Sequence, residues 1–180
     1  MADEHALIKR LESGDRDGLR EIYETYKNEM VTIATCLLSD VSAAEDCLQD
    51  VFVGLAGDTG RIQIRSSLKG YLVTSIANRA RDLLRKRKRK TVAIGDVAEP
   101  AGAESTPAEQ MSEKEESRHL RAVLATLPYE QREVIVLHLQ GRMTFKEIAT
   151  DQAVSINTAQ SRYRYGIEKL RRMLSNEVTA

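Results

Sequence analysis

Apolar residues recur at steps of three and four along almost the whole chain, and this spacing restricts what the chain can fold into. Side chains three or four positions apart share one face of an α-helix, so each such stretch predicts a helix with one buried face. The stretches are residues 17–38, 42–55, 68–84, 112–127, 128–139, 144–152 and 155–174. Aromatic residues make up only 4% of the chain, so the cores must be aliphatic. We therefore predict an all-α fold.

Residues 91–112 interrupt this pattern. They contain Pro100 and Pro107 among small and acidic residues and show no apolar stripe, which predicts a flexible acidic linker. The linker separates residues 1–90 from residues 113–180, and each of these parts is long enough for one small domain. The predicted architecture is therefore two small helical domains joined by the linker.

The net charge of zero hides an uneven distribution of charge. Residues 1–90 hold 16 basic and 14 acidic residues, residues 91–117 hold 1 and 7, and residues 118–180 hold 10 and 6. Local basic patches decide binding to nucleic acid, because salt screens the attraction of phosphates over roughly 10 Å. A neutral total is therefore compatible with two DNA-binding domains.

Several classes of protein are not indicated. Cys36 and Cys47 form no CxxC or Cys/His cluster, so we interpret them as reduced core residues and expect no metal and no cofactor. No P-loop or other catalytic motif is present, so we do not expect an enzyme. The charged first residues lack the apolar core of a signal peptide, and no run of about 18 apolar residues could span a membrane. We expect a cytoplasmic protein without membrane insertion.

Residues 144–174 have the pattern of a helix-turn-helix. Thr144 and Glu147 form a capping box at the start of a short helix, and Ser155 opens a longer helix after a tight turn. The start of that second helix carries polar and basic side chains, which pair with base edges in the major groove. The candidate DNA contacts are Asn157, Thr158, Gln160, Ser161, Arg162 and Arg164. Two positions depart from the usual pattern, since Gln152 replaces an apolar residue and Ala153 replaces the glycine of the turn.

Residues 127–174 resemble region 4 of bacterial RNA polymerase sigma factors. The family pattern has an LP-x-x-x-R segment, an apolar helix, a glycine, an EIA helix and a T-x-x-S-R recognition helix. This chain matches it at Leu127-Pro128, Arg132, Gly141, Glu147-Ile148-Ala149, Thr158 and Ser161-Arg162. The resemblance implies recognition of the −35 promoter element. Taken alone, the last helix could equally be an ordinary amphipathic helix with a solvated basic face.

Residues 44–52 resemble the AEDLVQEVF segment of sigma region 2. In that family the segment docks on the coiled coil of the β′ clamp of core RNA polymerase. The implied polymerase contacts are Asp46, Gln49, Asp50 and Phe52. The first three lie at steps of three and four on one helix face, and such an acidic and polar face suits a basic partner. An acidic face of this kind is also common on helices that are merely solvated.

Residues 69–86 are similar to the sigma helix that binds the −10 element. The family pattern has a WL pair, an Asn seven residues after the Trp, and D-x-x-R close behind. Here Tyr71-Leu72, Asn78, Asp82 and Arg85 match, with Tyr71 in place of Trp. The resemblance implies that Asn78, Arg79, Asp82, Arg85 and Lys86 contact the melted −10 strand. It also implies that the preceding loop, residues 58–67, forms part of a pocket for a flipped base.

Both resemblances occur in one chain, in the family's order, with a spacer too short for an intermediate domain. Together they identify the chain as similar to the small, extracytoplasmic-function (ECF) sigma factors of the sigma-70 family. The resemblance implies a transcription initiation factor with core RNA polymerase and promoter DNA as partners, in a family that often has an anti-sigma factor as well. The alternative is a helix-turn-helix regulator that never joins core polymerase, which would explain residues 115–175 but not residues 44–52. A nucleic-acid enzyme or a purely structural helical adaptor has no supporting motif.

Overall fold

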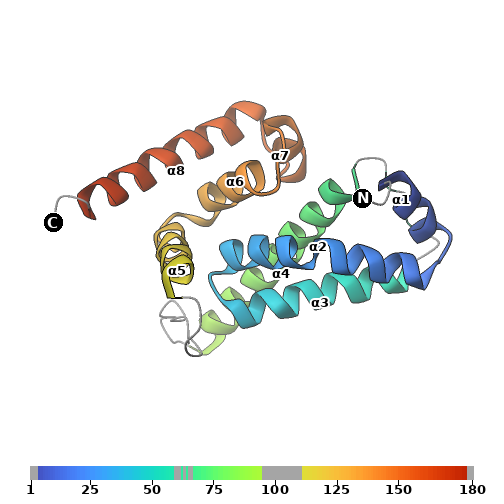
Figure 1. Ribbon diagram of the computed structural model, residues 1–180. Coiled ribbons are helices and arrows are strands. Elements are labelled where there is room, and N and C mark those ends of the chain that lie inside the picture. Colours follow the sequence, from blue (N-terminus) through green and yellow to red (C-terminus); the bar gives the residue numbers. More distant parts are fainter. Residues whose placement is uncertain (1–3, 59–61, 63, 65–66, 95–110, 178–180) are drawn as a thin grey trace. The chain divides into compact units, whose positions relative to one another are not determined.

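The structure is a computed structural model of the 180-residue chain. It describes all residues except 1–3, 59–61, 63, 65–66, 95–110 and 178–180. This described part contains eight α-helices and no strand (Figure 1), which confirms the predicted all-α fold. The chain divides into two compact units. The first contains residues 1–34 and 42–97, and the second contains residues 35–41 and 98–180.

The first unit contains α1 (Glu4–Glu12), most of α2 (Arg16–Leu38), α3 (Val41–Gly57) and α4 (Leu68–Ile94). Aliphatic side chains at the predicted three- and four-residue steps form its core, including Ile22, Met30, Leu48, Leu72 and Ile76. The rings of Tyr23 and Phe52 meet edge to face at 5.1 Å between α2 and α3. The Cys47 thiol donates to the carbonyl of Ile76 at 3.8 Å and so links α3 to α4.

The first unit differs from the sequence prediction at several boundaries. Helix α1 was not predicted at all. Helix α3 continues past Leu55, where the predicted helical stretch ends, and ends at Gly57. Helix α4 extends to Ile94, and α5 of the second unit begins at Met111, so helices take up both ends of the predicted linker. The remainder of that linker lies outside the described residues, as does much of the predicted flipped-base loop.

The second unit contains α5 (Met111–Ala125), α6 (Tyr129–Leu139), α7 (Phe145–Asp151) and α8 (Ile156–Glu177). Helix α6 is buried over most of its length, and α7 and the start of α8 pack beside it (Figure 1). Helices α6 and α8 approach closely at Gly166, because a Cβ atom there would lie 2.6 Å from Cδ1 of Ile135. A glycine at this position lets the recognition helix lie directly against the central helix of the unit.

The second unit differs from the sequence prediction at two points. Gly141, which matches the glycine that follows the apolar helix in the family pattern, is not the C-cap of α6. The C-cap is Gln140, and the left-handed residue that follows is Arg142, with φ of 54°. The Gly141 amide donates to the carbonyl of Val136 at 3.1 Å and so provides a hydrogen-bond partner for a carbonyl in the last turn of α6. Several apolar residues expected to face inward are instead exposed, namely Leu120, Leu139, Ile156 and Leu174. Helical spacing alone could not separate these edge positions from the core.

Both cysteines are free and buried, in agreement with their predicted role as core residues. Burial raises the pKa of the Cys47 thiol to about 11. At neutral pH the thiol therefore stays protonated, and this form is a poor nucleophile and a poor metal ligand.

Candidate nucleic-acid and partner interfaces

The helix-turn-helix is built by two helix caps and a strained turn. The amide of Glu147 donates to Oγ1 of Thr144 at 3.3 Å, and the Thr144 amide donates to Oε2 of Glu147 at 2.8 Å, so the predicted capping box is present. The Thr144 amide and the Thr144 hydroxyl both donate to the Glu147 carboxylate, and these bonds lower the pKa of Glu147 because they favour its charged form. The Thr158 amide donates to Oγ of Ser155 at 3.0 Å and caps α8 as predicted. Between the caps, Ala153 adopts φ of 52°, the left-handed conformation for which glycine is usual.

A cluster of three rings fixes the recognition helix to the rest of its unit. His138 of α6 stacks on Phe145 of α7 with ring centroids 4.4 Å apart, and both rings meet Tyr163 of α8 edge to face. The His138 Nδ1 atom lies 2.8 Å from the carbonyl oxygen of Met143, which anchors the imidazole to the segment between α6 and α7. No local sequence pattern indicates His138, because its ring partners lie on two other helices, α7 and α8.

A chain of hydrogen bonds runs from the core of the second unit to α8. Arg162 donates to Oε1 of Gln152 at 2.8 Å, and Nε2 of Gln152 donates to Oε2 of Glu133 at 2.7 Å. Glu133 is only 3% exposed, and its other oxygen accepts from the Tyr129 hydroxyl at 3.0 Å. Buried carboxylates require such partners, because an unpaired one is costly. The unusual Gln152 therefore links the buried Glu133 to Arg162.

The candidate −35 contacts fall into two groups in the structure. Asn157, Gln160 and Arg164 are exposed on α8, and the Arg164 guanidinium lies over the Tyr165 ring at 5.2 Å from its centroid. Thr158, Ser161 and Arg162 are only partly exposed. Thr158 takes part in the cap, and Arg162 takes part in the hydrogen bond to Gln152. The first group is thus available to a partner without rearrangement, whereas Arg162 is already engaged.

The candidate −10 contacts lie together on α4. Asn78 is exposed, and its Oδ1 accepts from Arg81 at 2.6 Å. Asp82 pairs with Arg85 one turn further on, and this hydrogen bond lowers the pKa of Asp82. Arg79 reaches instead to Asp50 of α3, where its Nε lies 2.8 Å from Oδ2. Lys86 continues an exposed basic run over residues 85–89, which gives this end of α4 a concentrated positive charge.

The candidate polymerase contacts on α3 do not all share one surface. Gln49 and Phe52 line an open pocket of about 570 Å³ between α2 and α3. Its apolar wall includes Val53, which is 63% exposed, and its polar rim includes Lys27 and Glu45. Phe52 itself is buried beside Tyr23, so it shapes the pocket floor and contributes little free surface. Asp46 is exposed outside the pocket, and Asp50 is paired with Arg79.

Among the described residues, no helix combines the length and the apolar character that crossing a membrane requires. Within the same residues, no three His, Cys, Asp or Glu side chains are grouped as metal ligands.

Comparison with known proteins gives two family matches. Residues 22–90 match the model of sigma-70 region 2, and residues 117–170 match that of sigma-70 region 4. The RNA polymerase sigma factor CarQ of Myxococcus xanthus is 28% identical, over 93% of this chain and 95% of its own length. The ECF RNA polymerase sigma factor SigW of Bacillus subtilis is 25% identical, over 93% and 94% of the two chains.

Two solved structures share the fold. The sigma factor RpoE in complex with the anti-sigma factor NepR from Bartonella quintana has a TM-score of 0.71 and 22% identity, over 87% of this chain and 96% of that chain. CnrH in complex with the cytosolic domain of CnrY has a TM-score of 0.69 and 18% identity, over 96% and 97%. The two region matches together span most of the chain, in the family's order, and the relatives align over nearly their whole length. The chain therefore belongs to the sigma-70 family of RNA polymerase sigma factors and is of the ECF type.

Proposed function

We propose that this sigma factor binds core RNA polymerase and directs it to promoters by two contacts with DNA. In this proposal α8 recognises the −35 element as duplex DNA, and α4 holds the melted −10 strand. One observation carries the proposal: a single chain combines exposed polar side chains at the start of α8 with an exposed Asn78 and basic run on α4. The cytoplasm is where we expect this activity, because transcription takes place there.

The start of α8 is suited to duplex DNA. A helix N-terminus carries a partial positive charge that attracts phosphates. Gln160 and Arg164 are exposed there, and Gln and Arg side chains form bidentate contacts with adenine and guanine edges in the major groove. The hydrogen bond to Gln152 holds the Arg162 side chain in one position. We therefore propose that Arg162 contacts the DNA at the edge of this surface in a fixed geometry.

Helix α4 is suited to a separated strand. Its exposed face pairs Asn78 with Arg81 and Asp82 with Arg85, and such surface pairs contribute little stability. Bases and phosphates can therefore replace these partners at low cost. The basic run over residues 85–89 would neutralise the phosphates of the bound strand.

The pocket between α2 and α3 is our candidate site for the β′ clamp of core polymerase. It combines an exposed apolar wall at Val53 with a polar rim at Gln49 and Glu45, as protein interfaces commonly do. Asp46 lies exposed on the same helix and would contact a basic partner from outside the pocket. An anti-sigma factor is a further candidate partner, since the solved structure of RpoE contains one.

Retention on immobilised core RNA polymerase tests this proposal against a regulator that acts without polymerase. We expect the full chain to be retained and the Asp46→Ala/Gln49→Ala variant to be retained several-fold less. Asp17→Ala, which removes an exposed carboxylate at the start of α2, is the control and should behave like the wild type. A wild-type chain that binds promoter DNA but is not retained would favour the regulator.

A further inference from the structure

Helix α1 lies outside the residues that match sigma-70 region 2, yet it is firmly built into the first unit. Leu7 and Leu11, one turn apart, are both buried, and Leu11 has no exposed surface. A helix of nine residues is too short to be stable alone, so α1 depends on its packing against the unit.

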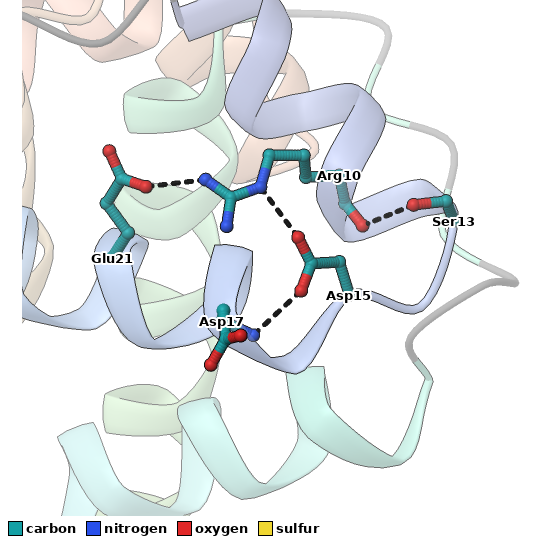
Figure 2. Close-up of polar contacts among 5 residues, drawn as sticks. All are labelled: Arg10, Ser13, Asp15, Asp17 and Glu21. Atoms are coloured by element: carbon teal, nitrogen blue, oxygen red, sulfur yellow. Dashed lines mark hydrogen bonds and ion pairs between the residues drawn. The ribbon is translucent and has the colours of Figure 1, made fainter.

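Arg10 ties α1 to the start of α2 (Figure 2). Its Nε lies 2.6 Å from Oδ2 of Asp15, and its Nη1 lies 2.6 Å from Oε2 of Glu21. Asp15 also caps α2, because its Oδ1 accepts from the Asp17 amide at 2.9 Å. The two helices approach closely here, since a Cβ atom at Gly18 would lie 2.9 Å from Cβ of Arg10. The ion pairs and this close contact together fix α1 on α2.

Two carboxylates of α1 hold the backbone that leads into α4. Oε1 of Glu4 accepts from the Leu68 amide at 2.5 Å, and Oε1 of Glu12 accepts from the Ile64 amide at 3.3 Å. Leu68 is the first residue of α4, and the first amides of a helix have no partner within the helix. A carboxylate is the favourable partner there, because it also meets the positive end of the helix dipole. Ser67 provides a second cap by accepting from the Gly70 amide at 3.0 Å.

From these contacts we infer that α1 is a positioning element for binding of the melted −10 strand. Arg10 fixes α1 to α2, and Glu4 and Glu12 then fix the entry to α4, the helix that carries Asn78 and the basic run. Glu4 and Glu12 are positioning residues, since both act through backbone amides of the entry segment. The inference rests on the proposed role of α4 in −10 binding.

The test compares the double variant Glu4→Ala/Glu12→Ala with the wild type in complex with core polymerase. Asp17→Ala/Glu24→Ala is the matched control, because it removes the same charge from exposed positions of α2. The probe is a single-stranded oligonucleotide with the non-template −10 sequence of a promoter that the holoenzyme transcribes. We expect the double variant to bind it about tenfold more weakly, and the control to bind like the wild type. Binding of a −35 duplex should not change.

Two additional measurements keep the inference falsifiable. Amide hydrogen exchange of Leu68 in the free chain should be about tenfold faster in the Ala variant, whatever its activity. The Glu4→Gln/Glu12→Gln variant keeps one acceptor oxygen on each side chain and should recover most of the strand binding, which also separates lost positioning from misfolding. The inference would be overturned if the Glu4→Ala/Glu12→Ala variant matched the control both in strand binding and in hydrogen exchange of the Leu68 amide. If Asn78→Ala also left strand binding unchanged, the proposed function of α4 would fail instead.

Discussion

The two units hold their candidate DNA contacts in different ways. In the second unit, caps, a ring cluster and a buried carboxylate fix the recognition helix, so that Arg162 is anchored through Gln152 to Glu133. In the first unit, the candidate contacts form ion pairs at the surface, as Asp82 does with Arg85 and Arg79 does with Asp50 of α3. A duplex has a fixed shape and suits a rigid surface, whereas a melted strand is flexible and suits side chains that exchange partners.

The largest effect is expected from Gly166→Leu. The added side chain would collide with Ile135 and Gln131 and push α8 away from α6. We expect a loss of about 2–3 kcal/mol in the free energy of unfolding of the second unit. This loss can be measured by chemical denaturation, with amide hydrogen exchange in α6 and α8 as the probe of the second unit. Arg171→Leu, at an exposed position of α8, should change stability by less than about 0.5 kcal/mol. Equal effects of the two variants would show that the helices are not tightly packed at Gly166.

Gln152→Leu tests whether the rigid surface depends on the hydrogen-bond chain. Leucine can neither donate to Glu133 nor accept from Arg162, so a buried acceptor loses a partner and Arg162 is released. We expect the free energy of unfolding of the second unit to fall by roughly 1–2 kcal/mol, which is within the range for loss of one partner of a buried group. We also expect weaker binding of a −35 duplex, because Arg162 is no longer held in place. Arg162→Ala should have a similar effect, and the double variant should add little to either. Gln140→Leu, at the exposed C-cap of α6, is the control.

Gln152 also shows how far the sequence could predict the structure. Helical periodicity predicted most helices, and the capping box at Thr144 and the cap at Ser155 were identified from local patterns, because these depend on neighbours in sequence. Gln152 was noticed only as a departure from the family pattern. Its partners, Glu133 and Arg162, lie 19 and 10 positions away, and no local rule connects them.

Helix α1 was missed for a similar reason. Its buried residues Leu7 and Leu11 form a stripe of only two positions, which is too short to stand out in a charged segment. Its roles are set by contacts of Glu4 and Glu12 with residues more than 50 positions away. The candidate contacts on α3 were identified by resemblance, but not the pairing of Asp50 with Arg79, which comes from the packing of α3 beside α4.

Ala153→Gly should stabilise the second unit, because it relieves strain in the turn of the helix-turn-helix. Ala153 has φ of 52°, a conformation that costs a non-glycine residue roughly 1–2 kcal/mol. Glycine relieves this strain but loses more backbone entropy on folding, so we expect a net gain of about 0.5–1 kcal/mol in the free energy of unfolding. Ala122→Gly, at an exposed site inside α5, should have the opposite sign. Denaturant titration of both variants measures the difference. A destabilised Ala153→Gly variant would contradict the assigned strain.

The smallest effect is expected from the pair Asp50 and Arg79. Both side chains are substantially exposed, at 47% and 28%, so solvent screens their attraction. A double-mutant cycle with Asp50→Ala and Arg79→Ala should give a coupling free energy below about 1 kcal/mol. The coupling should fall further in high salt, because exposed charges are screened. A coupling above about 2 kcal/mol would mean that the first unit holds its contacts as rigidly as the second.

Transcription by purified core RNA polymerase, with this chain added, tests whether the chain directs the polymerase to specific promoters. Sequencing of the transcripts from a genomic template should give start sites that share one −35 sequence and one −10 sequence. We expect Asn78→Ala to retain binding of the −35 duplex but to lose most permanganate reactivity at the −10 region, which reports the melted strand. Transcripts without a shared upstream sequence, or an Asn78→Ala variant that melts promoters as well as the wild type, would contradict the account.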